Sequence, residues 1–451
     1  MTGRYKAYPE YKDSGLDWLG QIPSHWEVTK TAWHFSAEKG KNGQLLTNEY
    51  IGQNEGDYPV YSGQTGNNGV MGCINSYEFD TGKEGVLFST TVGAKAMTLS
   101  HLKGKFSLSQ NCLIIQNKSP IFNTRFCFYH FQPLFSFERG LIPEHMQASF
   151  RMEDLYQYKI ASPSFSEQQK IANFLDHETA KIDTLIAKQK KLIELLKEKR
   201  QAVISHAVTK GLNPDAPMKN SGVEWLGEVP EHWEVSQLKH HVNTVNGFGF
   251  SSNDFQDEGV PFIRAGNIKN KTIVKPDIHL PQSVVDKYQR VIMNAGELVI
   301  SMVGSDPKIK ASAVGQVGLV PLSLAGSVPN QNVVILREKS SLIKQFLFYV
   351  VCGTPYRYHL DVFSHKLANQ SIISSSLIIN AHFAFPTLEE QMQVVDFLDT
   401  QLKKYDALVE KAISSIELMK ERKTALISAA VTGKIDVRDW KPAENNLVEV
   451  A

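Results

Sequence analysis

The sequence predicts an α+β fold with two mixed α/β domains and two long helices, and three observations carry this prediction. A motif of 15 residues occurs at Ser14–Val28 and again at Ser221–Val235, with ten identical positions. A block of 43 residues, Glu167–Thr209, returns at Glu390–Thr432 with 20 identities. The segments between these blocks are dissimilar and carry short β-branched runs, whereas the blocks themselves carry heptad-spaced apolar residues. The chain is therefore an internal duplication.

The repeated blocks divide the chain into six segments, and both copies follow the order of motif, variable middle and helix. A duplicated frame with dissimilar middles indicates one task performed on two different targets. The predicted segments are a first domain at residues 1–163, a helix at 164–210, a linker at 211–220, a second domain at 221–386, a helix at 387–436 and a tail at 437–451.

Each domain is predicted to be rich in β-structure and to contain one helix. Short runs of β-branched and aromatic residues are separated by Gly, Asn and Pro, which is the pattern of strands joined by turns. The helices are expected near residues 121–137 and 340–352. The clearest predicted strands are Gly85–Ser89, Cys112–Ile115, Glu297–Ser301 and Asn332–Leu336.

The repeated 43-residue blocks are predicted to form long helices. Each begins with a Ser/Thr-x-x-Glu capping box, at Ser164–Glu167 and at Thr387–Glu390, directly after a proline. Polar residues interrupt both heptad seams, so the two helices are expected to pack against each other. The predicted seams are Ile182, Leu185, Gln189, Leu192, Leu196, Lys199 and Val203, and Tyr405, Leu408, Ala412, Ser415, Met419, Arg422 and Leu426, widened by Ile186, Ile193, Val409 and Ile416.

The composition predicts a globular protein of the cytoplasm. Lys and Arg (48) nearly balance Asp and Glu (47), which excludes a protein that binds nucleic acid by bulk charge but allows local basic patches. The apolar runs are far shorter than the roughly 20 residues that span a bilayer, and the first residues lack the apolar stretch of a signal peptide. The four cysteines lie far apart, so neither disulfides nor a zinc site is expected.

The tryptophan motif, W-L-G-x-[IV]-P-x-H-W-E-V, is followed in both copies by a variable middle and by a helix that starts P-x-x-x-E-Q. In this order, the two copies resemble the specificity (S) subunit of type I restriction–modification systems. Two shorter segments are also similar to this family, Tyr58–Gly63 in the first middle and Val260–Ile268 in the second. The resemblance covers essentially the whole chain.

The resemblance implies a DNA reader that is not itself an enzyme. Each middle would be a target-recognition domain for one half of a split, asymmetric site in double-stranded DNA, and the domains would have a pseudo-two-fold arrangement. The long helices would form an antiparallel coiled coil. Two modification (methyltransferase) subunits would dock on one copy of the chain, and restriction subunits would join them. No cofactor is expected in this chain, since S-adenosylmethionine, ATP and Mg²⁺ would belong to the partner subunits.

The length of the helices agrees with a spacer role. The heptad pattern covers about 27 residues, which span roughly 40 Å at 1.5 Å per residue. One turn of B-DNA is about 34–36 Å. We therefore expect two half-sites centred about one helical turn apart.

Side chains that can hydrogen-bond base edges or phosphates are concentrated in a few segments of the middles. For any single one, a solvated turn is the simpler explanation. The pairs Gln110-Asn111 and Gln331-Asn332 are equivalent in the two copies, and a shared residue favours a framework role. The predicted DNA-binding residues are Tyr61, Ser62, Gln64, Asn67, Asn68, Ser89, Thr90, Thr91 and Lys95 in the first middle, and Arg264, Asn267, Lys269, Ser301, Ser305, Lys308 and Lys310 in the second.

Residues that occur in both copies of the frame have a different expectation. Trp18, Trp26, Trp225 and Trp233 are predicted to be structural, because a reader of duplex DNA meets no unstacked bases. Polar and aromatic residues shared by the two helices are candidates for contact with a partner subunit, with packing inside the chain as the simpler alternative. These candidates are Glu167, Gln168, Phe174, Glu390, Gln391 and Phe397.

The sequence contains no pattern typical of an enzyme. It lacks a GxxxxGK[ST] phosphate loop, an HExxH metal site and the Asn/Asp-Pro-Pro-aromatic motif expected beside a methylated adenine. The alternative function is a coiled-coil scaffold whose two variable domains bind protein or glycan ligands. Salt-dependent, sequence-specific DNA binding in complex with a methyltransferase would distinguish the two functions.

Overall fold

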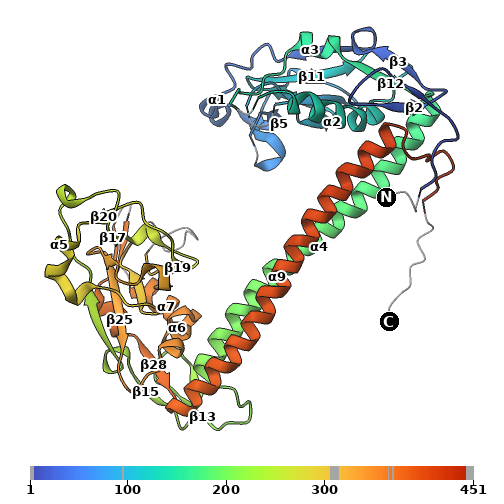
Figure 1. Ribbon diagram of the computed structural model, residues 1–451. Coiled ribbons are helices and arrows are strands. Elements are labelled where there is room, and N and C mark those ends of the chain that lie inside the picture. Colours follow the sequence, from blue (N-terminus) through green and yellow to red (C-terminus); the bar gives the residue numbers. More distant parts are fainter. Residues whose placement is uncertain are drawn as a thin grey trace. The chain divides into compact units, whose positions relative to one another are not determined.

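The computed structural model describes residues 5–64, 66–93, 96–143, 145–304, 314–363, 365–367 and 370–442. The chain forms two compact units, a first unit of residues 1–189 with 414–451 and a second unit of residues 190–413. Each unit contains one β-rich domain and a part of each long helix (Figure 1). The fold class is α+β, as predicted.

The first domain is built on two four-stranded sheets. One is antiparallel with the order β4-β11-β8-β9, and the other has the order β6-β5-β10-β7 with a parallel pair, β5 and β10, at its centre. The elements of this domain are β1 Tyr11–Asp13, β2 Gln21–Pro23, β3 Glu27–Lys30, β4 Phe35–Lys39, α1 Asn48–Gln53, β5 Glu55–Tyr61, β6 Val70–Ile74, β7 Phe79–Asp80, β8 Val86–Thr90, β9 Leu99–Leu102, β10 Lys105–Leu108, β11 Cys112–Asn117, α2 Thr124–Gly140, α3 Met152–Gln157 and β12 Lys159–Ser162.

The second domain repeats this plan with a larger sheet. The order is β16-β25-β21-β23-β19-β18, and a separate sheet, β20-β17-β24, again holds a parallel pair, β17 and β24. The elements are β13 Met218–Asn220, β14 Glu228–Pro230, β15 Glu234–Gln237, β16 Val242–Asn246, β17 Val260–Ile263, β18 Ile268–Lys269, β19 Lys271–Ile273, β20 His279–Leu280, α5 Gln282–Val285, β21 Leu298–Ser301, β22 Val303–Gly304, β23 Val317–Leu319, β24 Val328–Pro329, β25 Val333–Glu338, α6 Lys344–Cys352, α7 Thr354–Phe363, β26 His365–Leu367, β27 Gln370–Ile372, α8 Ser375–Ile379 and β28 His382–Phe385.

The four clearest strand predictions are confirmed as β8, β11, β21 and β25, whose side chains are buried at nearly every position. Strands covered on both faces appear in a sequence as continuous apolar runs, which is why these four were recognisable. The helices expected inside the domains are confirmed as α2 and α6, although both begin three or four residues later than predicted.

The repeated blocks form the long helices α4, Phe165–Lys210, and α9, Leu388–Val431. The hydroxyl groups of Ser164 and Thr387 each accept a hydrogen bond from the backbone N–H group three residues later, at 3.3 Å in both copies. The prediction that the second helix extends to residue 436 is wrong. Gly433, with φ of 72°, adopts a left-handed conformation just after Val431 and ends the helix.

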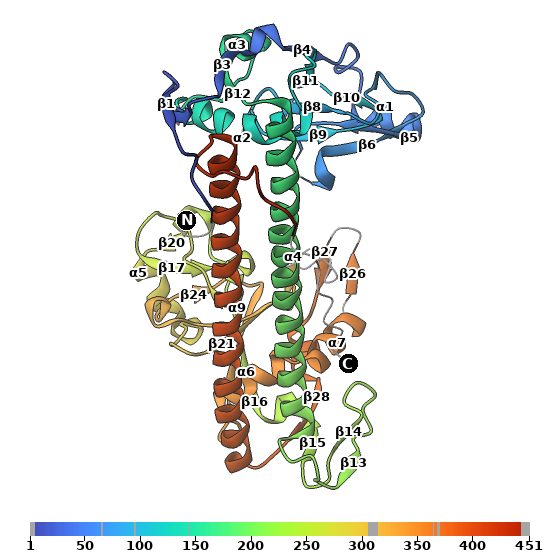
Figure 2. The same cartoon turned by 90° about the vertical axis from the view of Figure 1, so that its right-hand side faces the viewer.

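The two long helices pack side by side as an antiparallel coiled coil within each unit (Figure 2). In the second unit, Ile204 near the end of α4 and Leu398 near the start of α9 share one hydrophobic core. Further along, Arg200 pairs with Asp406 at 3.4 Å. In the first unit, Lys423 of α9 pairs with Asp183 of α4 at 2.7 Å.

At several positions of the seam between α4 and α9, the less exposed residue is the one that follows the predicted residue. Leu185, Leu192 and Leu408, which the heptad pattern placed inside, are 50%, 42% and 48% exposed. At each of these places the next residue is also apolar, so the heptad spacing fits either residue. Which of the two is buried depends on how the two helices pack against each other. The less exposed seam is Ile182, Ile186, Gln189, Ile193, Leu196, Arg200 and Val203 in α4, and Tyr405, Val409, Ala412, Ile416, Met419, Lys423 and Leu426 in α9.

His130 of α2 is fully buried in the core of the first unit, between two backbone groups. Its Nε2 atom accepts a hydrogen bond from the N–H group of Ala161 at 3.2 Å, so its Nδ1–H group donates to the carbonyl oxygen of Val431 at 3.0 Å. Burial lowers the pKa of His130 from 6.5 to about 4. A proton added to Nε2 would face the Ala161 N–H group, so that two donors would oppose each other, and this also favours the neutral ring.

Acid is therefore expected to destabilise the first unit through His130. Between pH 6.5 and about 4 this residue stays neutral in the folded chain but takes up a proton in the unfolded chain, so stability falls as the pH falls. The expected loss is about 3 kcal/mol, at about 1.4 kcal/mol per pKa unit. Hydrogen exchange of peptides from the first unit measures it, and His130→Gln should show a smaller loss over the same range. An equal pH dependence in both chains would contradict this role of His130.

Candidate nucleic-acid interface

In each domain, a pair of parallel strands ends at loops rich in polar residues; in the second domain, β19 and β23 form a further parallel pair within the larger sheet. In the first domain β5 and β10 end together, and the N–H group of Ser109 donates to the carbonyl oxygen of Tyr61 at 2.9 Å. In the second domain β17 and β24 end together, and the N–H group of Asn330 donates to the carbonyl oxygen of Ile263 at 2.8 Å. Ligands often bind outside the carboxyl ends of parallel strands, so these loops are the candidate interface.

A third loop joins this arrangement in both domains. After β8, the N–H group of Thr91 donates to the carbonyl oxygen of Asn111 at 2.8 Å, and after β21, Met302 makes the same bond to Asn332 at 2.7 Å. The three loops form a loop cluster in each domain. The first loop cluster consists of residues 62–64, 66–69, 91–93 and 109–111, and the second of residues 264–267, 302–304 and 330–332.

Several residues predicted to bind DNA lie on the surface of the first loop cluster. Gln64, Asn67 and Asn68 are exposed, and the amide groups of the first two donate to the carbonyl oxygen of Val70. Ser62 is largely buried, and its hydroxyl accepts a hydrogen bond from the N–H group of Gln64 at 3.3 Å. Asn68 is thus the exposed residue of this loop whose side chain makes no hydrogen bond to the rest of the described chain.

Four other predicted DNA-binding residues are buried, and the prediction for them is corrected. Ser89 and Ser301 are 0% exposed, and Thr90 and Thr91 are also buried. Ser89, Thr90 and Ser301 lie at the ends of β8 and β21, which are central strands buried along their length, and Thr91 directly follows β8. Tyr61 is half-buried at the end of β5. The predicted residues Lys95, Ser305, Lys308 and Lys310 lie outside the described residues.

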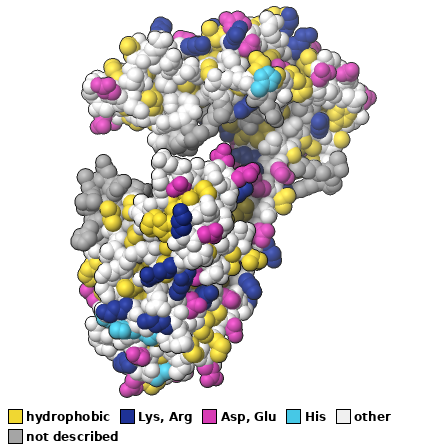
Figure 3. Space-filling model, turned by 60° about the vertical axis from the view of Figure 1, so that its left-hand side comes forward, with side chains coloured by type: hydrophobic (Ala, Val, Ile, Leu, Met, Phe, Trp, Pro, Cys, Tyr) yellow, Lys and Arg dark blue, Asp and Glu magenta, His cyan; other side chains and the backbone are white. Residues whose placement is uncertain are grey.

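In the second loop cluster, the side chains of two predicted residues make contacts within the domain, and a third predicted residue is exposed beside the cluster. Arg264 pairs with Asp277 at 2.6 Å and lowers the pKa of that carboxyl group. The side-chain oxygen of Asn267 accepts a hydrogen bond from the N–H group of Arg264 at 2.8 Å. Lys269 is exposed directly after this loop. Lys and Arg side chains gather on part of the visible face of the second domain (Figure 3).

The aromatic residue Phe248 borders the second loop cluster, and the equivalent position in the first domain holds Lys41. Phe248 follows β16 as Lys41 follows β4. Its ring is 39% exposed and lies 4.2 Å from the ring of Tyr288, and its N–H group donates to the carbonyl oxygen of Pro329 at 3.0 Å. The two clusters therefore share a backbone frame but present different side chains.

Gln110 and Gln331 are exposed members of the two loop clusters that the sequence interpretation set aside as framework. Their side-chain amides make no hydrogen bond within the described part of the chain. The signal for them was their exact correspondence in the duplication, but correspondence alone cannot tell a framework residue from one that meets a common ligand.

The tryptophan motif has the predicted structural role in both units. Trp26 is 0% exposed, and its Nε1–H group donates to Glu167 at 3.0 Å. Glu167 also accepts a hydrogen bond from the hydroxyl of Tyr8 at 2.6 Å and lies 3.0 Å from Nε2 of His25. In the second unit, Trp233 donates to Glu390 at 3.0 Å. Because Glu167 is only 4% exposed, its predicted contact with a partner subunit is corrected to a structural role.

Three other predicted partner contacts are also corrected. Gln168 and Gln391 are 0% exposed, and each side chain makes hydrogen bonds to three backbone groups. Phe174 is 0% exposed, because Tyr5 and Trp440 cover it in edge-to-face contacts at 5.4 and 5.3 Å. The equivalent Phe397 in the second unit is 37% exposed and remains available to a partner.

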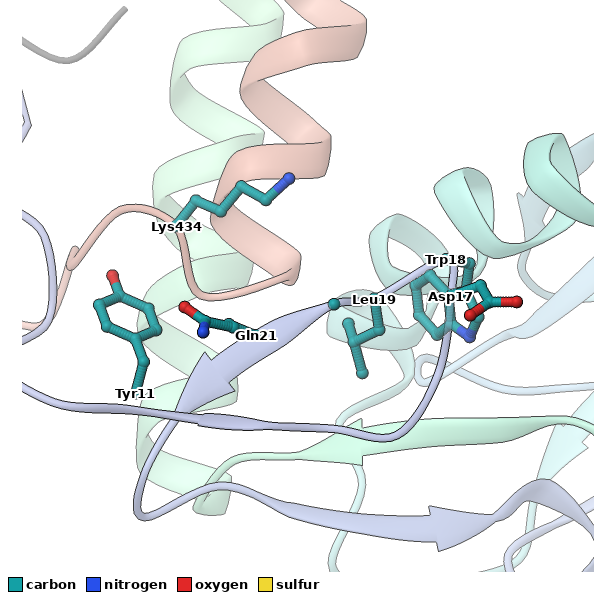
Figure 4. A pocket seen from close by; sticks show the side chains of 7 residues that line it. Tyr11, Asp17, Trp18, Leu19, Gln21 and Lys434 are labelled. Atoms are coloured by element: carbon teal, nitrogen blue, oxygen red, sulfur yellow. The ribbon is translucent and has the colours of Figure 1, made fainter.

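A shallow groove of about 380 Å³ lies beside the tryptophan motif in the first unit (Figure 4). Tyr11, Gln21 and Lys434 border one part of it, and Asp17 and Trp18 border the other. Trp18 packs edge-on against His130 at 5.4 Å, as expected for a structural residue. Asp17, Gln21 and Lys434 are exposed and come from a turn, the start of β2 and the segment after α9.

Phe397 belongs to an exposed surface of the second unit that combines apolar and basic side chains. It lines a groove of about 530 Å³ with Lys199, Ala202 and His206 of α4, so both helices contribute to the same side of the coil. Helical spacing of three and four residues continues this side along each helix. The basic-apolar face consists of Leu192, Leu195, Lys199, Ala202 and His206 of α4 and Phe397, Gln401, Lys404, Leu408 and Lys411 of α9, and contains no Asp or Glu.

Metal clusters, disulfides and membrane-spanning helices are three further features to consider among the described residues. No group of three or more His, Cys, Asp or Glu residues could hold a metal ion in the described ranges. All four cysteines are free. Among the described helices, none is both long and apolar enough to span a bilayer.

Comparison with known proteins places the chain among restriction–modification proteins. The chain is 26% identical over 433 residues to the type I restriction enzyme MjaVIII specificity subunit of Methanocaldococcus jannaschii, covering 93% of this chain and 95% of that one. It is 21% identical to the EcoBI specificity subunit of Escherichia coli, over 76% and 72% of the two chains.

Solved structures share the fold. A chain from a structure of the assembly and conformational transition of the type I R-M system has a TM-score of 0.66 at 14% identity, covering 92% of this chain and 99% of that one. The HsdS subunit of Thermoanaerobacter tengcongensis has a TM-score of 0.50 at 15% identity, covering 92% and 98%. The family model of the type I restriction modification DNA specificity domain matches residues 35–195 and 230–418. The chain therefore belongs to the type I restriction–modification DNA specificity family, whose members are the non-catalytic specificity subunits of these systems.

Proposed function

We propose that this chain reads a two-part DNA site, with one half-site recognised by each loop cluster. The observation that supports the proposal most is the pair of loop clusters with matching backbone hydrogen bonds and different side chains. Equivalent positions hold Ser62 and Arg264 within the clusters, and Lys41 and Phe248 beside them. Two readers built on one frame would approach DNA in the same way but recognise different base sequences.

The coiled coil would act as the spacer between the half-sites. Its length, of the order of one turn of B-DNA in the heptad portion, supports half-sites about one turn apart. One copy of the chain carries both readers, which fits one copy beside two methyltransferase subunits. Restriction subunits would join this complex, and S-adenosylmethionine, ATP and Mg²⁺ would bind to the partner subunits.

The basic-apolar face is the proposed docking surface for a methyltransferase subunit. Leu192, Leu195 and Leu408 expose 42–49% of their surface there, which is unusual for three leucines in a soluble helix pair. Three lysines flank them without a neighbouring carboxylate on this face. A complementary partner would therefore present an apolar surface rimmed by acidic side chains.

A domain duplication tests the two-reader proposal. Residues 228–385 would be replaced by a second copy of residues 21–162, so that the elements from β14 to β28 are exchanged for those from β2 to β12 and no strand is cut. Selection from a randomised duplex library, with the chain bound to its methyltransferase, should then yield two copies of the first half-site. An unchanged target would show that the second domain does not read DNA.

A further inference from the structure

Gln110 and Gln331 stand at the same place in the two loop clusters. Each follows the second strand of its parallel pair, β10 or β24, and each precedes an Asn that receives the hydrogen bond from the third loop. The main chain is held firmly at these positions. The N–H group of Gln110 donates to the carbonyl oxygen of Gly43 at 2.9 Å, and Asn332 N–H donates to the side chain of Asn330 at 3.2 Å.

A framework role does not explain these two side chains. The chain contains a clear example of shared framework glutamines, Gln168 and Gln391, which are 0% exposed and hydrogen-bonded to backbone groups at 2.8–3.1 Å. Gln110 and Gln331 show the opposite properties, because both are exposed and their amides have no hydrogen-bond partner among the described residues. Because these two side chains lie in loop clusters at the ends of parallel strands, their shared exposure makes them candidates for contact with a ligand that both clusters bind.

We propose that Gln110 and Gln331 donate hydrogen bonds to the sugar–phosphate backbone, one in each half-site. The inference rests on the proposed function, in which the two clusters read different sequences. The neighbouring side chains differ between the clusters, as Ser62 and Arg264 do, so bases in the two half-sites are expected to differ as well. The backbone is the part of duplex DNA that both clusters meet in the same form, and Gln amides are common donors to phosphate oxygens.

Single and double Gln→Ala variants test this inference in the complex with the methyltransferase. The probes are a duplex enriched from a randomised library and a duplex of shuffled sequence, at one salt concentration. Each single variant should weaken binding to both probes by about three- to tenfold, and the ratio of the two affinities should stay constant. Gln110→Glu should weaken binding more than Gln110→Ala, because a carboxylate would face phosphates. Gln157→Ala is the matched control, since this exposed residue at the end of α3 lies outside the cluster.

Two results would overturn the inference. A change of base preference at one position would mean that the glutamine reads a base, and unchanged affinity for both probes would mean that it contacts no DNA. A complex with the natural chain that fails to prefer the enriched duplex would contradict the proposed function instead. In that case, binding to the shuffled duplex still decides whether the two glutamines contact the backbone.

Discussion

Replacing Glu167 by alanine is expected to lower the free energy of unfolding of the first unit by about 2–5 kcal/mol. The substitution leaves the Nε1–H group of Trp26 and the hydroxyl of Tyr8 without their acceptor, 3.0 and 2.6 Å away in the natural chain. Each buried donor left unpaired costs about 1–3 kcal/mol. Burial and the bond to Glu167 raise the pKa of Tyr8 far above its ordinary range, so the phenol remains a donor.

The second unit provides the matched control. Glu390 accepts a hydrogen bond from Trp233 at 3.0 Å and lies 2.9 Å from His232, but its side chain is 24% exposed, so water can replace it. Glu390→Ala is therefore expected to cost about 1 kcal/mol. Hydrogen exchange of the full chain, followed separately for peptides of each unit, measures both effects. Equal losses in the two units would contradict the account of Glu167 as a buried acceptor.

Replacing Leu408 by aspartate is expected to weaken binding of the methyltransferase subunit by about 30-fold or more. Leu408 lies between Lys404 and Lys411 on the basic-apolar face and is 48% exposed. An aspartate there removes an apolar contact and places a carboxylate opposite an acidic partner. Central interface residues commonly contribute about 2 kcal/mol or more, which corresponds to this factor.

Ile413 is the control for this substitution, because it is 50% exposed on the same helix but lies on the opposite flank of the seam. Ile413→Asp should change the affinity for the methyltransferase by less than about threefold. Sedimentation or light scattering of the mixed subunits measures both variants, and circular dichroism checks that the helices remain folded. If Ile413→Asp dissociates the complex and Leu408→Asp does not, the docking surface is on the other side of the coil.

Most of the architecture could be predicted from the sequence because the chain is an internal duplication, so that each pattern occurs twice. The repeated tryptophan motif, the capping boxes and the fully buried strands are local patterns, and each formed the predicted element. The seam of the coiled coil was less readable. Leu192 and Ile193 are equally apolar neighbours, and packing against the other helix, which the spacing does not reveal, buries Ile193 more deeply than Leu192.

The candidate interface was predictable only in part. The predicted segments after β5 and β17 lie at the ends of parallel strands, in the two loop clusters, and their contact with DNA stays a prediction. Burial within these segments depends on sheet pairing across distant residues, so Ser89 and Ser301 appeared available in the sequence but lie inside central strands. Arg264 pairs with Asp277, which lies 13 residues later in a loop. No sequence pattern predicts that this loop folds back onto Arg264.

The central claim is that one chain reads two different half-sites separated by an unread gap. Selection from a randomised duplex library, with the chain bound to its methyltransferase, tests it most directly. The account predicts two distinct short sequences at a constant separation of about one helical turn. A single continuous site, or no enrichment by an intact complex, would contradict it.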